Sequence, residues 1–103
     1  MIKGTSLTFS DGTTLVVPPL NLAAIEVLQD RLKTWSGSTA PDSIKLVVDA
    51  THMALKRNYP DMTREAVAEL LDLDTMQECM KAVMKVSGFE ARAASGEPMG
   101  VST

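Results

Sequence analysis

The chain has little of what enzyme sites and metal centres are usually built from. Among its 103 residues there is one cysteine, one histidine and only 4% aromatic side chains. A single cysteine, Cys79, excludes an intrachain disulfide and a cysteine-based metal cluster. The sequence shows no secretory signal and no apolar run long enough to cross a bilayer. These absences predict a soluble, cytosolic protein that is not bound to a membrane.

Residues that could carry catalysis are also scarce and badly placed. The glycines are isolated, so no phosphate-binding glycine loop is formed. His52 shares the expected solvated side of its helix with Lys45, Asp49 and Lys56, which indicates a surface histidine. Cys79 lies on an apolar stripe, where a free cysteine behaves as a small hydrophobic residue. We therefore expect no enzyme, no metal and no cofactor.

What is present suits one small globular domain. The chain is 45% hydrophobic and 22% charged, with a net charge of −3. The charge is uneven, because residues 61–90 carry three basic and seven acidic side chains. An acidic half of this kind is a poor match for a phosphate backbone, so nucleic acid is not expected as a partner.

A β-hairpin is predicted over residues 5–17. Asp11-Gly12 between two short strands is typical of a two-residue hairpin turn. Leu7 and Phe9 alternate with polar residues, so one face of the first strand is apolar. An isolated hairpin is only marginally stable. It must therefore pack on its own helices or pair by its edge with a second subunit.

Two helices are predicted next, over residues 21–35 and 42–58. Asn21 is the expected N-cap of the first, and Asp42 or Ser43 that of the second. The first helix has an apolar stripe made by Leu22, Ile25, Leu28, Leu32 and Trp35. The second has a second apolar row of Leu46, Ala50 and Met53, away from its main stripe of Ile44, Val47, Val48, Thr51, Ala54 and Leu55. A helix apolar on two sides is either central in a bundle or shared between subunits.

A helical hairpin over residues 63–72 and 75–87 closes the predicted domain. Pro60 ends the preceding helix, and Thr63 is the expected N-cap of the third. Asp74 with Gln77 three residues later indicates a capping box for the fourth. The last helix has an apolar stripe of Met76, Cys79, Met80 and Val83, and Gly88 stands where a helix would stop.

The fold class that follows is mainly α (α+β), with an N-terminal β-hairpin and a compact bundle of about four helices. Residues 1–89 form a single domain. Residues 90–103 have too few large apolar side chains to fold alone, so a flexible tail is expected.

The stretch RNYPDMTREAVAELLDLDTMQECMKAVMKVSG, residues 57–88, resembles the tail assembly chaperones of long-tailed bacteriophages and prophages. The resemblance rests on the Arg-Asn-Tyr-Pro-Asp-x-Thr junction, on an acidic helix ending Leu-Leu-Asp-Leu, and on a last helix ending Ser-Gly. The segment VVPPL after the hairpin is a further point of likeness. It covers most of the chain, from about Leu7 to Gly88, but includes no catalytic motif.

This resemblance implies a non-enzymatic protein that binds the tape measure protein and keeps it soluble until the tail tube polymerises around it. The tail tube protein is a further implied partner, and self-assembly into rings or spirals is implied as well. The place of action is the cytoplasm of the bacterial host, and the protein is expected to be absent from the mature virion.

Methionine suggests where such a client would bind. Met76, Met80 and Met84 recur at helical spacing on the last helix, and Met62 is near in sequence. They are either core filler or an adaptable groove for an apolar partner helix, since flexible thioethers repack around varied surfaces. For subunit contacts the candidates are the row of Leu46, Ala50 and Met53, or the hairpin edge with Leu7 and Phe9.

The alternative function is that of a small helix-turn-helix DNA-binding regulator of phage origin. REAVAELLDLDTMQECMKAV has about the length and rhythm of that motif. Against it, the corner is Asp72-Leu73-Asp74 where glycine is common, the second helix has no arginine, and the hairpin is acidic.

Overall fold

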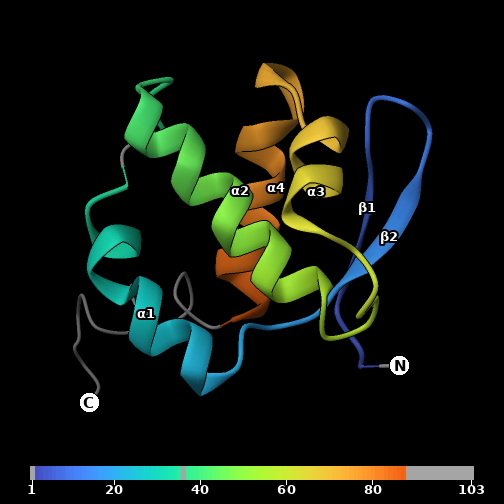
Figure 1. The fold of residues 1–103 in the computed structure, drawn as a ribbon, viewed down its shortest axis with the longest axis horizontal. Coiled ribbons are helices and arrows are strands. Elements are labelled where there is room, and N and C mark those ends of the chain that lie inside the picture. The colour runs from blue at the N-terminus through green and yellow to red at the C-terminus, as the bar shows by residue number, and fades with distance from the viewer. Residues whose placement is uncertain (1, 36, 88–103) are drawn as a thin grey trace, which may run out of the picture.

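The structure, a computed structural model, describes residues 2–35 and 37–87. In this part of the chain two strands are followed by four helices (Figure 1): β1 (Thr5–Thr8), β2 (Thr14–Val17), α1 (Leu22–Lys33), α2 (Pro41–Leu55), α3 (Arg64–Leu70) and α4 (Leu73–Val86). The predicted fold class, a β-hairpin followed by a compact helical bundle, is confirmed. The predicted tail, residues 90–103, and Gly88 lie outside the described residues.

Helix α2 is the centre of the bundle. It crosses the middle of the molecule with α1 on one side and α3 and α4 on the other (Figure 1). It contacts α1, α3, α4 and β2, and it buries residues on both of its apolar sides, among them Leu46, Val47, Ala50 and Thr51. Of the two interpretations of this doubly apolar helix, the central position is therefore the one observed.

The hairpin packs on its own helices, β1 against α4 and β2 against both α2 and α4. The antiparallel register pairs Leu7 with Leu15 and Thr8 with Thr14. The predicted two-residue turn is wrong, because three residues separate Phe9 from Thr13. The Phe9 N–H donates to the Thr13 carbonyl at 2.8 Å, and the φ of Gly12 is +90°. A turn followed by a residue in the left-handed region is the usual three-residue hairpin loop, and it needs the glycine at that position.

The junction after α2 ties the N-terminal segment to the bundle. The Asn58 side-chain amide donates to the Ile2 carbonyl at 2.8 Å and accepts from the Ile2 N–H at 2.6 Å. The Tyr59 hydroxyl accepts from the Val16 N–H at 3.0 Å. The Arg57 guanidinium donates to the carbonyl of Pro19. Three consecutive side chains thus satisfy backbone groups that the two-stranded hairpin leaves unpaired.

Helix capping follows the sequence at two of four helices. Asn21 and Thr63 cap α1 and α3 as predicted. Helix α2 begins with Pro41, and its N-cap Ala40 provides no side-chain bond, so neither Asp42 nor Ser43 is the cap. Proline is favourable there because its fixed φ suits the first helical position and its missing N–H costs nothing.

The predicted capping box of α4 is wrong by two residues. Asp72 is the N-cap, accepting from the Thr75 N–H at 2.9 Å, and the Thr75 hydroxyl closes the box. Because Leu71 is extended, the new helix can begin only at Leu73. Gln77 instead donates its side-chain amide to the carbonyl of Gly37, whose φ is +81°.

Helix α1 departs from its predicted stripe at both ends. Its buried residues are Ala24, Leu28 and Leu32, whereas Leu22 in the first turn is 78% exposed. The helix ends at Lys33, before Trp35. The Trp35 ring is half-buried against the core, as expected of an anchor residue, and its indole Nε1 has no hydrogen-bond partner among the described residues.

Candidate functional site

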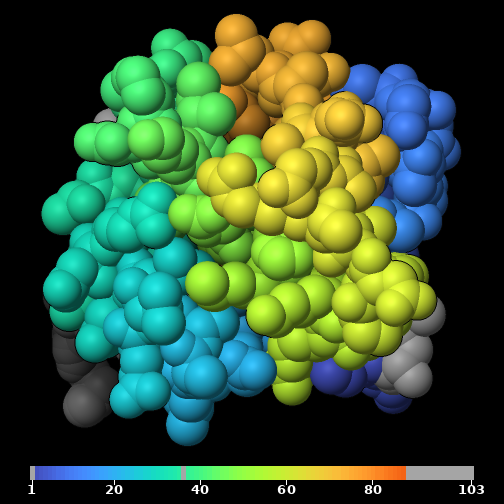
Figure 2. Space-filling model, viewed as in Figure 1, coloured from blue at the N-terminus to red at the C-terminus, as the bar shows by residue number. Residues whose placement is uncertain are grey.

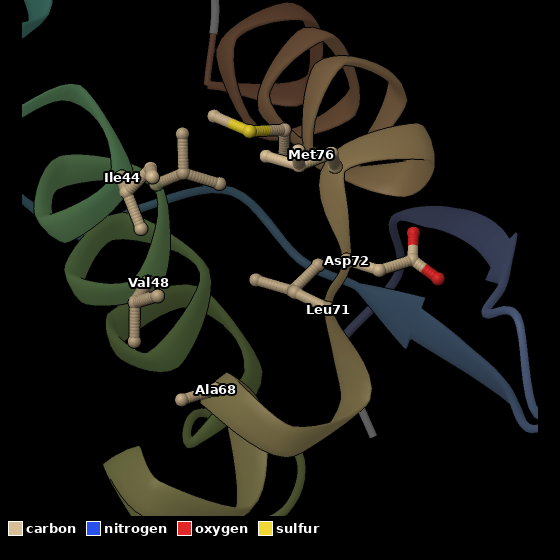
Figure 3. Close-up of a pocket in the computed structure, with 8 residues that line it drawn as sticks. Ile44, Val48, Ala68, Leu71, Asp72 and Met76 are labelled. Carbon is tan, nitrogen blue, oxygen red and sulfur yellow. The ribbon is translucent and has the colours of Figure 1, made fainter. Parts of the chain in front are cut away.

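An apolar groove opens between α2 and the corner where α3 turns into α4 (Figure 3). Its volume is about 360 Å³, and its lining consists of Ile44, Val47, Val48, Ala68, Leu71, Asp72, Leu73 and Met76. In the space-filling view the surface is hollowed between the start of α2 and the α3–α4 corner (Figure 2). Apart from Asp72, every residue of the lining has an apolar side chain, so the groove suits an apolar ligand or a protein side chain.

One wall of the groove is the first half of α2. Ile44 and Val48 lie one turn apart on the same face, with exposed fractions of 38% and 7%. Exposure therefore falls along the wall from the rim at Ile44 to the interior at Val48. Both residues belong to the main apolar stripe of this helix, and the packing of α3 leaves the start of that stripe uncovered.

The other wall is the α3–α4 corner. Leu71 points into the groove toward the α2 wall (Figure 3), and Leu73 at the start of α4 is 60% exposed. The Asp72 carboxylate points away from the groove (Figure 3). Hydrogen bonds from the Ser10 hydroxyl and from Thr75 lower the pKa of this carboxyl. Asp72 thus fixes the corner that carries the apolar rim.

The methionines are mostly core residues. Met80 is fully buried and Met76 is 4% exposed, and Met62 and Met84 are half-buried against the same core. Only Met76 lines the groove, where it forms part of the floor. The predicted four-methionine surface is therefore wrong as a surface, because the stripe of α4 turns inward onto α2. A groove is present, but of its eight lining residues only Met76 was among the predicted site residues.

The prediction of a subunit surface is also wrong for most of its residues. Leu46, Ala50 and Phe9 are buried inside the single chain, and Leu7 is half-buried against its core. They are therefore not available as a subunit surface in this structure. Periodicity identified them as apolar, but α1 and the helices beneath the hairpin supply their partners.

Met53 is the remaining member of the predicted row, and it borders a second cavity, of mixed polarity. This cavity, of about 240 Å³, lies between α1 and the end of α2 and is lined by Asn21, Ala23, Ala24, Val27, Met53 and Lys56. Two exposed aliphatic side chains stand on α1 beside it, Leu22 at 78% and Val27 at 65% exposure. The apolar surface that the structure offers at this end was not predicted from the α1 stripe.

Two ion pairs on one carboxylate connect three helices. Asp49 of α2 accepts from Arg64 of α3 at 2.6 Å and from Arg31 of α1 at 3.3 Å. The three side chains are partly exposed, so their contribution to stability is modest. Their geometric role is to hold the start of α3 beside α2, at the inner end of the groove wall.

The side chains with chemical reactivity are held in structural contacts. His52 is half-buried rather than solvated, and its Nε2 lies 3.1 Å from the Met62 carbonyl, so this nitrogen donates the proton. Burial raises the pKa of the Cys79 thiol to about 11, and Thr51 lies 3.1 Å from its sulfur. Within the described residues no group of three or more potential ligands is placed to hold a metal ion.

A larger hollow of about 540 Å³ lies between the end of α1 and the start of α2 and has mixed polarity, with Arg31, Thr34, Asp42 and Ser43 beside Trp35 and Leu46. None of the helices in the described part has the length and apolar composition needed to span a membrane.

No family model, no curated protein and no solved structure matches the chain. The described residues form a small helical domain with an apolar groove beside its central helix.

Proposed function

We propose that the chain is a tail assembly chaperone, which binds the tape measure protein and keeps it soluble before the tail tube polymerises. The resemblance of residues 57–88 to that family supports this proposal, and so does the groove between α2 and the α3–α4 corner. The groove is the observation that carries it. An amphipathic client helix needs a concave apolar surface that receives side chains at i, i+3 or i+4, and i+7. The proposed protein is not an enzyme and acts in the cytoplasm of the bacterial host.

The proposed mechanism is helix-in-groove capture. A long helical client exposes apolar stripes that would otherwise pair with one another and aggregate. Docking one stripe between Ile44 and Leu73, over the floor at Met76, removes that surface from water. A groove bordered by methionine and small residues such as Ala68 tolerates varied client side chains. We place the tail tube protein as a later partner that displaces the chaperone when polymerisation begins.

The regulator alternative has less support in the geometry. The exposed start of α4, which would enter a major groove, carries Asp72, Asp74 and Glu78. Carboxylates at this position repel phosphates. Gel shift with duplex DNA at low salt is the measurement that would restore it.

The test uses one substitution on two faces of α3. Ala68 lines the groove, and Ala66 is an exposed residue two positions earlier, on another face of the same helix. In co-expression with the tape measure protein of the same phage, Ala68→Gln should weaken co-purification about tenfold or more, because an amide fills and polarises the apolar site. Ala66→Gln should leave it unchanged. Equal retention of the client by both variants would remove the groove as the client site.

We also propose that the chain self-associates, through the cavity at Met53. Leu22 and Val27 protrude beside this cavity. In two copies related by a twofold axis, these side chains of each copy would therefore insert into the cavity of the other. Charge supports a second copy as the occupant. Glu26 is exposed on α1 and Lys56 borders the cavity, and within the described residues neither forms an ion pair.

Light scattering on the purified chain checks this surface. Val27→Asp should convert the oligomer to monomer without loss of helical circular dichroism, because Val27 is already 65% exposed. Glu26→Lys should weaken association, and adding Lys56→Glu should restore it. An unchanged mass for Val27→Asp would show that copies meet elsewhere.

A further inference from the structure

The charge around the groove is one-sided. The wall formed by the second half of α3 and the start of α4 lies within residues 65–74, which contain four acidic side chains and no basic one. These residues, all exposed, are Glu65, Glu69, Asp72 and Asp74. The lining is apolar apart from Asp72, whose carboxylate points away from the groove (Figure 3), so the carboxylates border the apolar site without filling it.

Little positive charge balances this wall. On α2 the groove residue Ile44 is followed by Lys45, but Asp42 lies in the same helical turn. Arg64, the basic residue nearest in sequence to the acidic wall, is already held by Asp49 at 2.6 Å. Acidic side chains therefore outnumber basic ones in the segments that flank the groove. At physiological salt, such charges interact over about 8 Å.

The carboxylates lie close enough to the mouth to act on a bound helix. Glu65 is one helical turn before the groove residue Ala68, and residues three apart are neighbours on a helix surface. Glu69 follows Ala68 directly. The Asp72 carboxylate points away from the groove (Figure 3) and contributes only through the field.

We propose that the groove selects an amphipathic helix whose apolar stripe is bordered by lysine or arginine residues. This inference rests on the proposed function and specifies the charge of the client segment. The stripe fills the apolar lining between Ile44 and Leu73. Lysine and arginine have long aliphatic stems, which lie over an apolar rim while their charged ends reach the carboxylates of Glu65 and Glu69. A helix bordered by acidic residues meets like charge at the same positions and is rejected.

Two designed peptides test the charge preference. Both have about 18 residues and the same leucine and methionine stripe at i, i+3, i+4 and i+7, and they differ only in lysine or glutamate at the flanking positions. Fluorescence anisotropy on the full chain should give at least tenfold tighter binding of the lysine peptide at about 50 mM salt. The ratio should fall toward one at about 500 mM salt, where the charges are screened.

Charge reversal on the protein locates the effect. The double variant Glu65→Lys and Glu69→Lys should lose the preference or invert it. The matched control is Asp30→Lys with Asp61→Lys, which makes the same change of net charge on exposed residues that do not line the groove. The control should retain the preference for the lysine peptide. A preference lost in the control and kept at Glu65 and Glu69 would overturn the assignment.

The outcomes separate this inference from the proposed function. Equal binding of the two peptides, both blocked by Ala68→Gln, overturns the charge preference and leaves the groove as a docking site. Failure of both peptides, while the tape measure protein still co-purifies with the chain, overturns the peptide-groove assignment. If Ala68→Gln halves the mass of the chain in light scattering, a second copy occupies the groove and the inference is also overturned.

Discussion

The two sides of α2 are built from similar residues but are covered very differently. On the side of α1, Leu46 and Ala50 are 3% and 0% exposed, although hollows of about 540 and 240 Å³ lie at the two ends of this contact. On the side of α3 and α4, Ile44 remains 38% exposed above a groove of about 360 Å³. The same periodic apolar pattern is thus buried against α1 on one side and borders an open apolar groove on the other.

The difference comes from the helix that covers each side. Helix α1 has 12 residues and is fixed by three buried side chains, whereas α3 has 7 residues and buries only Val67. At 1.5 Å per residue, α3 is about 10 Å long against about 22 Å for α2. Among the helices and strands described, α3 packs against α2 alone. Because α3 is short, it leaves part of the apolar stripe on α2 exposed.

The largest difference between the two sides should come from placing the same acidic substitution on each side of α2. Ala50→Asp places a carboxylate in a fully buried position, which costs several kcal/mol against a total stability of roughly 5–10 kcal/mol. We expect loss of the helical circular dichroism signal at 25 °C. Ile44→Asp, on the rim, should retain the fold with a loss of about 1 kcal/mol in urea unfolding. Similar unfolding of both variants would mean that the two sides are equally closed.

Truncation of one buried side chain in each covering helix should sharpen the comparison. Leu28→Ala in α1 should lower the free energy of unfolding by about 3 kcal/mol, through lost burial and a cavity. Val67→Ala should cost about 2 kcal/mol, and most of this should appear as local opening of α3. Hydrogen exchange checks it, because the amides of α3 should lose protection while those of α4 keep it. A uniform loss of amide protection across the chain would show that α3 does not open independently of the other helices.

Thiol chemistry gives the smallest effect and compares the buried core with the groove. Cys79 packs in the core with a pKa of about 11, so Ellman's reagent should leave it unmodified at pH 8 in the folded chain. The variant Ala68→Cys should react at once at its groove position.

The pH dependence follows with a definite sign. The pKa of the Cys79 thiol is higher in the folded chain than in the unfolded chain. Its contribution to the free energy of unfolding is therefore intact below about pH 9 and falls as the pH rises toward 11. The loss is at most about 3 kcal/mol. The alkaline slope should be smaller in Cys79→Ala, and an equal slope would assign it to other groups.

The sequence was sufficient to predict the helices and strands, but not which of them pack against one another. Asn21 and Thr63 could be identified as caps because their interactions are local. The choice between Asp72 and Asp74 depended on where the chain becomes extended at Leu71, a tertiary matter. Periodicity marked Met80 and Ala50 as apolar, yet an apolar stripe is the same whether it meets its own chain or a partner.

The groove itself was beyond sequence reasoning for a similar reason. It exists because α3 ends early, and its lining comes from three helices whose contacts no local pattern encodes. The junction residues Arg57, Asn58 and Tyr59 were noticed only as points of family likeness. Their partners are backbone groups of Ile2, Val16 and Pro19, which leave no trace in side-chain patterns.

That junction has a consequence for how the chain assembles during synthesis. Asn58, Tyr59 and Arg57 lie 56, 43 and 38 residues after the backbone groups they bind. The hairpin leaves the ribosome first and, as an isolated pair of strands, is only marginally stable. At about 5–20 residues per second, it waits roughly 2–10 s before its anchors are made. The first structure to emerge from the ribosome is therefore among the last to become stable, and ribosome-stalled chains ending before residue 57 should contain an unprotected hairpin.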